Sequence, residues 1–310
     1  MPLPYSRSVK RSNHMTNELP EIGSPARTKA ILNRYRLVAK KSLGQNFLSD
    51  LNILRNIVAA GDVNDHDNVI EIGPGIGALT EQIAKRAHKV VAFEIDENLL
   101  PVLDETLMDY KNVKIINEDI LKANLPAVVA DEFEAGRPLK LVANLPYYIT
   151  TPILMGVLQS TVRFEAIVVM MQAEVAERLV AEPGTKAYGS LSVIMQYRAH
   201  VEIAFNVPRT AFIPQPNVDS AIIRLTPREA LPVNPYEDKA LFSFVKGCFA
   251  HRRKSLWNNL QGIFGKQPEV RERIETVLNQ TGISRQLRPE RLTLLNFIEL
   301  TNAFHNEGLM

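Results

Sequence analysis

Cysteine is nearly absent from the sequence, and this removes several kinds of structure. Cys248 is the only cysteine among 310 residues, so the chain can form no internal disulfide and no site of several thiolates. None of the six histidines has the spacing of metal ligands, and we expect no metal. The low cysteine content is typical of a reducing compartment, which favours a cytoplasmic protein.

Long apolar runs are missing as well. The longest uncharged run, residues 141–162, contains an asparagine, two prolines and several hydroxyl side chains, so it would span a membrane poorly. The first 25 residues hold no continuous apolar stretch, and we expect no secretory signal. With 45% apolar and 23% charged residues, the composition is that of a folded protein of about two domains.

Net charge is only +2, but the charges are unevenly distributed. Residues 1–41 carry nine lysines and arginines against two acidic residues, a net +7, and residues 239–291 carry eleven against four, again +7. Residues 42–238 have a net charge of −10. Two basic segments around an acidic middle favour a polyanionic ligand, although charge blocks are also found on solvated faces, and the counts alone leave both interpretations open.

The beginning of the chain separates into an arm and two helices. Residues 1–23 are polar and lack periodic apolar positions, so we interpret them as an arm or extension. Ser24 as the N-cap, followed by Pro25, predicts a helix that runs to about Lys40. Asp50 predicts the cap of a second, amphipathic helix that ends at Gly61.

From residue 68 onward, short apolar runs alternate with helical stretches such as 78–87 and 97–109. This alternation predicts βαβ units and a parallel sheet covered by helices on both faces. Strand-like runs at 200–207 and 218–225 predict an antiparallel pair that completes the sheet. The five apolar runs are 69–72, 90–95, 113–116, 139–143 and 167–171.

Beyond Tyr236 the sequence has only helical patterns, and the turn-rich stretch 226–236 predicts a domain boundary. We therefore expect an α/β domain at 24–230 and an all-helical domain at 231–310. The predicted C-terminal helices cover 237–250, 252–264, 268–281 and 293–305.

A glycine-rich loop follows the first strand. Gly73, Gly75 and Gly77 allow a sharp turn and a close approach of a ligand to the backbone. Glu94 ends the second strand, where its carboxylate can accept both hydroxyls of a ribose, and Asp119 follows the third, where it could accept from an adenine amino group or cap a helix. Because the loop also matches the dinucleotide fingerprint, an NAD-dependent oxidoreductase stays open at this point.

The tetrapeptide Asn144-Leu145-Pro146-Tyr147 follows the fourth strand and suits methyl transfer to an exocyclic amine. The Asn144 side-chain oxygen and a backbone carbonyl, accepting from the two N–H groups, would free the nitrogen lone pair by positioning and electrostatics. Pro146 fixes the loop, and Tyr147 offers a ring on which a base can stack. A strand-end turn with a buried tyrosine is the alternative. The tetrapeptide offers no site for a hydride acceptor, which disfavours the oxidoreductase.

A basic cluster lies in the C-terminal part of the chain. His251, Arg252, Arg253 and Lys254 are predicted to open a helix, and the three cations Arg252, Arg253 and Lys254 to bind RNA phosphates. A solvated helix face is the alternative interpretation.

Seven segments occur together in one order, and with them the sequence resembles the ribosomal RNA adenine N6-dimethyltransferases. The resemblance is to the KsgA/RsmA branch, which dimethylates two adjacent adenosines near the 3′ end of small-subunit (16S) rRNA, and it covers about residues 28–305. The segments are SLGQNFL (42–48), EIGPGIGALT (71–80), FEID (93–96), EDIL (118–121), NLPYYITTPI (144–153), AFIPQPNVDSA (211–221) and FAHRRKSLWNNL (249–260).

The resemblance implies a Rossmann-like methyltransferase fold with a small C-terminal helical domain, S-adenosyl-L-methionine as cofactor, and a monomer that acts on an immature 30S subunit. It also implies that Asn144 and Tyr147 hold the target adenine and that Phe212 closes over it. Asn46 and Leu48 are assigned to the cofactor by the resemblance alone. The full set of implied cofactor contacts is Asn46, Leu48, Gly73, Glu94, Asp119 and Asn144.

The sequence departs from the family at two places, and two related functions compete. Tyr148 stands where many relatives have asparagine, and residues 1–23 precede the usual start. Methyltransferases of large-subunit rRNA usually depart from GPGIG and lack the 249–260 segment in this form, which disfavours them. A non-catalytic ribosome-assembly factor is disfavoured by the intact Asn144, Pro146 and Tyr147.

Overall fold

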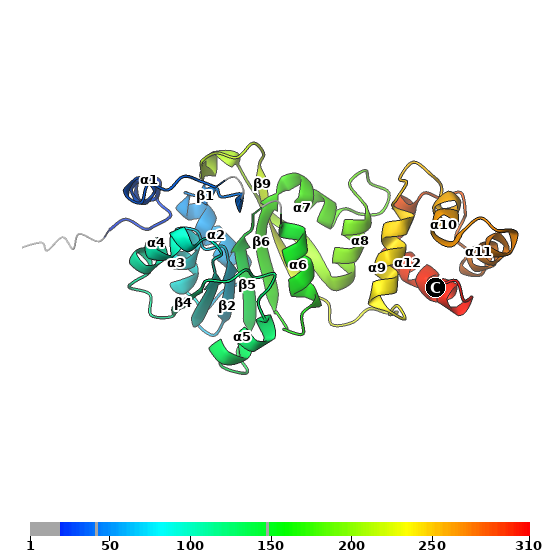
Figure 1. Ribbon diagram of the computed structural model, residues 1–310, viewed down its shortest axis with the longest axis horizontal. Coiled ribbons are helices and arrows are strands. Elements are labelled where there is room, and N and C mark those ends of the chain that lie inside the picture. The colour runs from blue at the N-terminus through cyan, green and yellow to red at the C-terminus, as the bar shows by residue number, and fades with distance from the viewer. Residues whose placement is uncertain (1–18, 41–42, 147–148) are drawn as a thin grey trace, which may run out of the picture.

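The computed structural model describes residues 19–40, 43–146 and 149–310 and contains a seven-stranded sheet of order β4-β3-β2-β5-β6-β9-β7 (Figure 1). Strands β2 to β6 run parallel, while β9 is antiparallel to both β6 and β7. Both the parallel sheet and the antiparallel pair at its edge are confirmed. The strands are β2 (Asn68–Ile72), β3 (Lys89–Phe93), β4 (Val113–Ile116), β5 (Leu139–Asn144), β6 (Ala166–Gln172), β7 (Ala199–Val207) and β9 (Ser220–Pro227).

Helices cover both faces of this sheet because successive strand residues point to opposite sides. In β2, Val69 belongs to the core under α2, α3 and α4, whereas Ile70 belongs to the core under α5, α6 and α7. All five residues of β2 are buried, as a central parallel strand requires. The helices are α2 (Leu51–Ala60), α3 (Ala78–Ala84), α4 (Leu100–Thr106), α5 (Leu125–Glu132), α6 (Thr150–Gln159) and α7 (Ala173–Val180).

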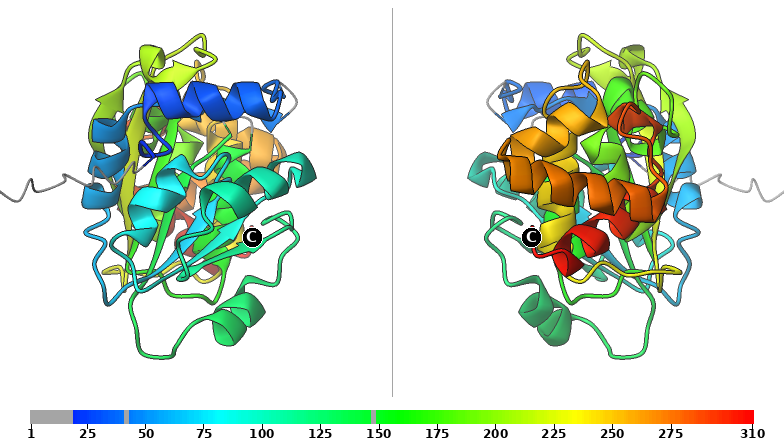
Figure 2. Two further views of the ribbon diagram at one scale, coloured as in Figure 1. Left: turned by 90° about the vertical axis from the view of Figure 1, so that its left-hand side faces the viewer. Right: turned by 90° about the vertical axis from the view of Figure 1, so that its right-hand side faces the viewer.

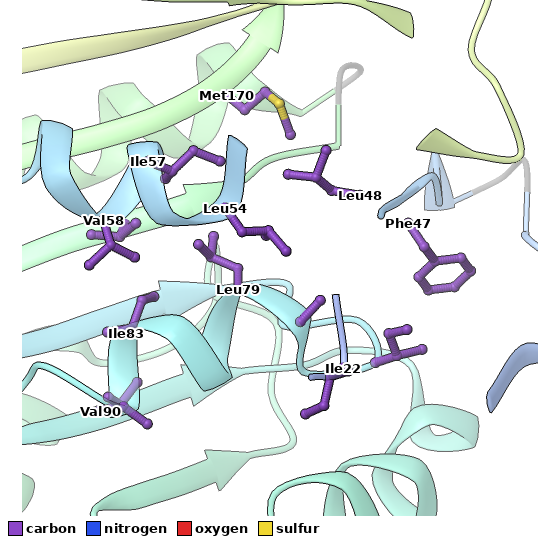
Figure 3. Packing of buried hydrophobic residues seen from close by; sticks show 14 of the residues in the cluster. Ile22, Phe47, Leu48, Leu54, Ile57, Val58, Leu79, Ile83, Val90 and Met170 are labelled. Carbon is purple, nitrogen blue, oxygen red and sulfur yellow. The ribbon is translucent and has the colours of Figure 1, made fainter. Parts of the chain in front are cut away.

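Leu54 of α2 and Leu79 of α3 lie close together in the core on the first of these faces, with Ile83 and Val90 nearby (Figure 3). Asp50 caps α2 as predicted, because its carboxylate accepts the N–H groups of Asn52 and Ile53. The apolar side of α2 packs on α3 and on the sheet. This packing fixes α2 beside the strands.

Helix α1 (Pro25–Arg34) begins at the predicted cap, Ser24, but the prediction that it runs to about Lys40 is wrong. The Leu37 N–H donates to the Leu32 carbonyl, and Arg36 has a φ of 49°, a left-handed conformation that ends the helix. In the left view of Figure 2, α1 crosses the top of the α/β part, and α5 lies at the bottom.

The C-terminal part is helical, as predicted, and lies at the right in Figure 1 and in front in the right view of Figure 2. Helix α11 has the predicted bounds, and the other three begin or end within a few residues of theirs. Tyr188, Val193 and Ile194 from the α7–α8 connection and α8 pack into the same core as these helices, so the predicted boundary at 226–236 stays a prediction. The helices are α8 (Ser190–Arg198), α9 (Asp238–Cys248), α10 (Leu256–Phe264), α11 (Pro268–Thr281) and α12 (Leu294–Asn306).

The prediction that the basic cluster opens a helix is wrong. Residues 249–254 form a turn between α9 and α10. The side chain of Asn259 binds the backbone N–H and carbonyl of His251, and Ser255 caps α10 by accepting the Asn258 N–H. Because the cap is placed after the cations, they lie outside the helix.

No helix within the described ranges is long and apolar enough to cross a membrane.

One buried ion pair stabilises the edge of the sheet opposite the carboxyl ends of its parallel strands. The Lys140 ammonium lies 2.9 Å from the Asp67 carboxylate and 2.8 Å from the Asp62 carbonyl, and the Lys140 and Asp67 side chains are 3% and 1% exposed. Removing one partner leaves an uncompensated charge in the interior.

We expect Lys140→Met to lower the free energy of unfolding by about 3–5 kcal/mol, because Asp67 would stay buried without a counter-ion. The matched control is Lys114→Met in β4, whose half-exposed ammonium pairs with Glu132 and should contribute about 0–1 kcal/mol. Urea unfolding of both variants measures the difference. Equal losses in the two variants would contradict the role of the buried pair.

Candidate functional site

A cavity of about 300 Å³ opens where the parallel strands end. The register pairs Ile72 of β2 with Phe93 of β3 and with Ala143 of β5, so Gly73, Glu94 and Asn144 follow at the same level on three adjacent strands. All the residues that were expected to hold a cofactor line this cavity, and Phe212 lines it too. They are Asn46, Leu48, Gly73, Glu94, Asp119 and Asn144.

The glycine loop forms one wall of the cavity. Gly73, Gly75 and Gly77 have φ values of 72°, 61° and 90°, which only glycine adopts without strain. The Gly73 N–H donates to the Phe93 carbonyl at 2.9 Å, and a Cβ on Gly77 would approach Leu107 to 3.1 Å. The loop is therefore held by the sheet on one side and by close packing on the other, and its backbone is exposed to the cavity.

The Glu94 carboxylate lies at the end of β3 and is fixed by backbone groups. One oxygen accepts the Asp96 N–H at 2.8 Å, and the other accepts the Gly75 N–H at 3.3 Å. Burial raises the pKa of Glu94, while the backbone hydrogen bonds oppose the rise. Each carboxylate oxygen keeps a further lone pair, so the group can accept two ligand hydroxyls.

Asp96 links Glu94 to the segment that precedes α2. As expected of an N-cap, it accepts the Asn98 N–H, but it also lies 2.7 Å from the Lys40 ammonium and 2.9 Å from the Gln45 amide nitrogen. Burial raises the pKa of Asp96, but hydrogen bonds from Lys40, Asn98 and Gln45 outweigh it and lower the pKa to about 2. These long-range partners were not predicted from the sequence, where their only signal was an acidic residue two positions after Glu94.

A short ribbon beside the glycine loop forms another wall of the cavity. Strands β1 (Phe47–Leu48) and β8 (Phe212–Ile213) pair antiparallel, and Leu48 faces Phe212 in the register. The Ser49 N–H continues the pairing with the Ala211 carbonyl at 2.8 Å. Residues far apart in the sequence thus form one wall, which explains why both Leu48 and Phe212 reach the cavity. Neither strand was predicted from the sequence.

Asn144 is the last residue of β5, and Leu145 and Pro146 follow it. The Pro146 carbonyl accepts the Ile149 N–H at 3.2 Å and the Thr150 hydroxyl at 3.0 Å, which ties Pro146 to the start of α6. Asp119 lies across the cavity, where its carboxylate accepts the Leu121 N–H. Tyr147 lies outside the described residues, so its stacking role stays a prediction.

Glu71 is a buried carboxyl on the strand that leads into the glycine loop. It is buried in β2, and one of its oxygens has no hydrogen-bond partner among the described residues. Burial raises the pKa of Glu71 to about 8, and the charge of Glu94 adds to the rise. Burial therefore favours the neutral form of Glu71, although its sequence position gave no sign of this.

The cations predicted to bind RNA lie apart from the cavity. Arg252, Arg253 and Lys254 are exposed on the turn before α10, and the Arg252 guanidinium donates to the carbonyls of Lys186 and Tyr188 at 2.8 Å each. Within the described part of the chain, no group of three or more histidine, cysteine, aspartate or glutamate side chains could hold a metal ion.

Comparisons with known proteins agree on one family. Residues 36–300 match the ribosomal RNA adenine dimethylase family. A protein of Ligilactobacillus salivarius named ribosomal RNA small subunit methyltransferase A is 61% identical, over 95% of this chain and 100% of its own length. The protein of the same name from Lactiplantibacillus plantarum is 60% identical, over 94% of this chain and 98% of its own.

Two solved structures share the fold. A dimethyladenosine transferase from Plasmodium falciparum has a TM-score of 0.70 and 24% identity, covering 84% of this chain and 98% of its own. The 23S rRNA methyltransferase ErmE has a TM-score of 0.63 and 27% identity, covering 84% of this chain and 100% of its own. Both relationships match the Rossmann-like methyltransferase fold expected from the sequence.

Because Glu71 keeps its proton when folded, the free energy of unfolding should fall as pH rises. The unfolded chain releases the Glu71 proton near the ordinary pKa of 4.5, whereas the folded protein releases it only near pH 8. The contribution of Glu71 to the free energy of unfolding is therefore fully present below pH 4.5 and is lost as pH rises from 4.5 to about 8. The free energy of unfolding of Glu71→Gln relative to wild type should therefore increase as pH rises from 5 to about 8. Above pH 8 the difference between the two proteins should stay nearly constant. Urea unfolding across this range measures the gain.

The matched control is Glu177→Gln, which changes an exposed carboxylate on α7. It should shift stability little at any pH. A stability difference between Glu71→Gln and wild type that does not vary with pH would show that Glu71 is ionised in the folded protein.

Proposed function

The chain belongs to the ribosomal RNA adenine dimethylase family, and from this we propose that it transfers methyl groups from S-adenosylmethionine to N6 of two adjacent adenosines near the 3′ end of 16S rRNA. The family resemblance inferred from the seven segments is thereby confirmed. The observation that carries the proposal is the single cavity in which Gly73, Glu94, Asp119 and Asn144 meet. The enzyme works as a cytoplasmic monomer on immature 30S subunits.

The residues of the cavity fit the proposed cofactor. Its volume of about 300 Å³ is within the range of small-molecule sites. Glu94 would accept the ribose hydroxyls, and Asp119 the adenine amino group. The positive-φ glycines leave space beside Phe47 and the Asn144 carbonyl that a Cβ would narrow. When bound there, S-adenosylmethionine supplies an electrophilic methyl group on a sulfonium.

Asn144 would hold the acceptor amine. Its side-chain oxygen accepts one N–H of the target adenine, and a backbone carbonyl accepts the other, so the nitrogen lone pair turns toward the methyl group. The Pro146 carbonyl already accepts two hydrogen bonds, from Ile149 and Thr150, which leaves the Leu145 carbonyl for the second contact. Tyr147 would stack on the base, and Phe212 would face it from the β1–β8 ribbon.

The substrate is assigned to the small subunit rather than to the large one. The relatives at 60–61% identity carry a small-subunit name, whereas the 23S rRNA enzyme of known structure is 27% identical. The basic turn with Arg252, Arg253 and Lys254 would supply contacts to RNA phosphates, which add affinity without reading sequence.

We expect Asn144→Ala to lower methyl transfer by at least ~10²-fold, the usual effect of removing one preorganised polar group. RNA affinity should stay near that of wild type, because most of it comes from phosphates elsewhere. The measurement is transfer of labelled methyl to undermethylated 30S subunits, with the adenine products resolved chromatographically. Asn279→Ala, on an exposed position of α11, is the matched control. Near-normal rates in Asn144→Ala would contradict the placement of the amine.

We expect Glu94→Gln to weaken S-adenosylmethionine binding by about 1–3 kcal/mol, the loss of charge-assisted hydrogen bonds. Because burial raises the pKa of Glu94, this carboxylate becomes protonated at a higher pH than an exposed glutamate does. The affinity of wild type for the cofactor should therefore begin to fall at that higher pH on acidification, and Glu94→Gln should remove this pH dependence. Calorimetry at several pH values measures both effects.

The control for this variant is Glu97→Gln, an exposed glutamate three residues further on, which should bind the cofactor like wild type. Wild type should not bind NAD. An unchanged dissociation constant in Glu94→Gln would mean that Glu94 does not contact the ribose.

A further inference from the structure

The connection from α7 to α8 is bound to the C-terminal helices. We call residues 181–189 the α7–α8 loop. Its Gly184 N–H donates to the Glu290 carbonyl at 2.6 Å, and its buried Tyr188 hydroxyl donates to the Leu292 carbonyl at 2.9 Å. The loop is therefore fixed to the segment before α12, although it belongs to the sheet-bearing part of the chain.

Arg252 adds a third link between the loop and the C-terminal helices. Its guanidinium donates from one nitrogen to the carbonyls of Lys186 and Tyr188, both at 2.8 Å. A guanidinium that binds two carbonyls in this way is oriented toward the loop backbone. Arg252 therefore holds the position of Lys186 relative to the basic turn.

Three exposed cations lie on the two segments that Arg252 joins. Lys186, Arg253 and Lys254 are all exposed, and no carboxylate of the described residues lies within ion-pair distance of any of them. Glu182 is the only acidic residue of the α7–α8 loop. Together with Arg252, the three cations outnumber this one carboxylate, so the α7–α8 loop and the basic turn carry a net positive charge.

The same surface lies on the side of the molecule that carries the cavity wall. In Figure 1 the connection from α7 to α8 and that from α9 to α10 both lie along the upper side, where β1 also lies. An RNA strand that reaches the cavity can therefore extend along these two connections.

We propose that Lys186 contacts an RNA phosphate and that Arg252 is a positioning residue, which holds Lys186 beside Arg253 and Lys254 so that the three cations bind neighbouring phosphates. This inference rests on the proposed function, which makes RNA the substrate. Phosphate is the favoured partner chemistry because three exposed cations without counter-ions, on two segments joined by Arg252, suit a closely spaced row of anions.

The test measures binding of wild type and variants to undermethylated 30S subunits and to protein-free 16S rRNA between about 50 and 200 mM salt. Lys186→Ala should weaken binding and reduce the slope of log affinity against log salt by about 0.7–0.9, the effect of one phosphate contact. Lys266→Ala, an exposed lysine beyond the far end of α10, is the matched control and should bind like wild type.

Arg252→Ala should also weaken binding, and adding Lys186→Ala to it should change the salt slope little, because the lysine is no longer held in place. Additive effects of the two substitutions would overturn the positioning role of Arg252. An unchanged slope in Lys186→Ala would overturn the phosphate contact. Because Lys186→Ala alters only an exposed side chain, it keeps the proposal testable if Arg252→Ala unfolds.

Failure of the inference can be distinguished from failure of the proposed function. If wild type binds neither 30S subunits nor 16S rRNA, the proposed function fails and the inference with it. If wild type binds and Lys186→Ala matches it, only the inference fails. A loss in Lys186→Ala that appears with 30S subunits but not with protein-free rRNA would assign the contact to a ribosomal protein and also overturn it. Calorimetry should show unchanged cofactor affinity in every variant.

Discussion

The parallel register of β2, β3 and β5 is the constraint on which the site depends. It places Gly73, Glu94 and Asn144 at one level of three adjacent strands, so the proposed ribose, methyl-donor and amine contacts share one edge of the sheet. A slip of one residue would turn every side chain of a strand to the opposite face, and it would remove both hydrophobic cores together with the site. The fully buried β2 makes such a slip very costly.

The second half of the site comes from residues that the sheet does not carry. Asp96 binds Lys40 and Gln45, and the β1–β8 ribbon joins Leu48 to Phe212, so the segment before α2 becomes a wall of the cavity. The acidic groups near the cavity also differ in charge state. Burial raises the pKa of Glu71 to about 8 and so favours its neutral form, whereas hydrogen bonds lower the pKa of Asp96 to about 2. The fold therefore does not favour full negative charges on Glu71, Glu94 and Asp96 together.

Local patterns predicted what local physics determines. The seven strands of the main sheet, the cap at Asp50 and the bounds of α11 follow from apolar periodicity and capping, and the roles suggested for Glu94 and Asn144 follow from strand ends. The errors occurred where distant contacts decide the structure. Helix α1 ends early because of a left-handed turn at Arg36, and Asn259 shapes the basic turn from eight residues away. No local signal could show that Arg252 binds the α7–α8 loop.

The central claim is that this chain dimethylates two adjacent adenosines of 16S rRNA, and primer extension tests it most directly. N6,N6-dimethyladenosine has lost both N–H groups of its exocyclic amine and cannot form the normal base pair, so reverse transcriptase stops at it. Small-subunit rRNA from cells with the gene should give two adjacent stops near the 3′ end, and these should vanish when the gene is deleted and return when it is restored. Stops that persist in the deletion strain, or a change confined to 23S rRNA, would contradict the account.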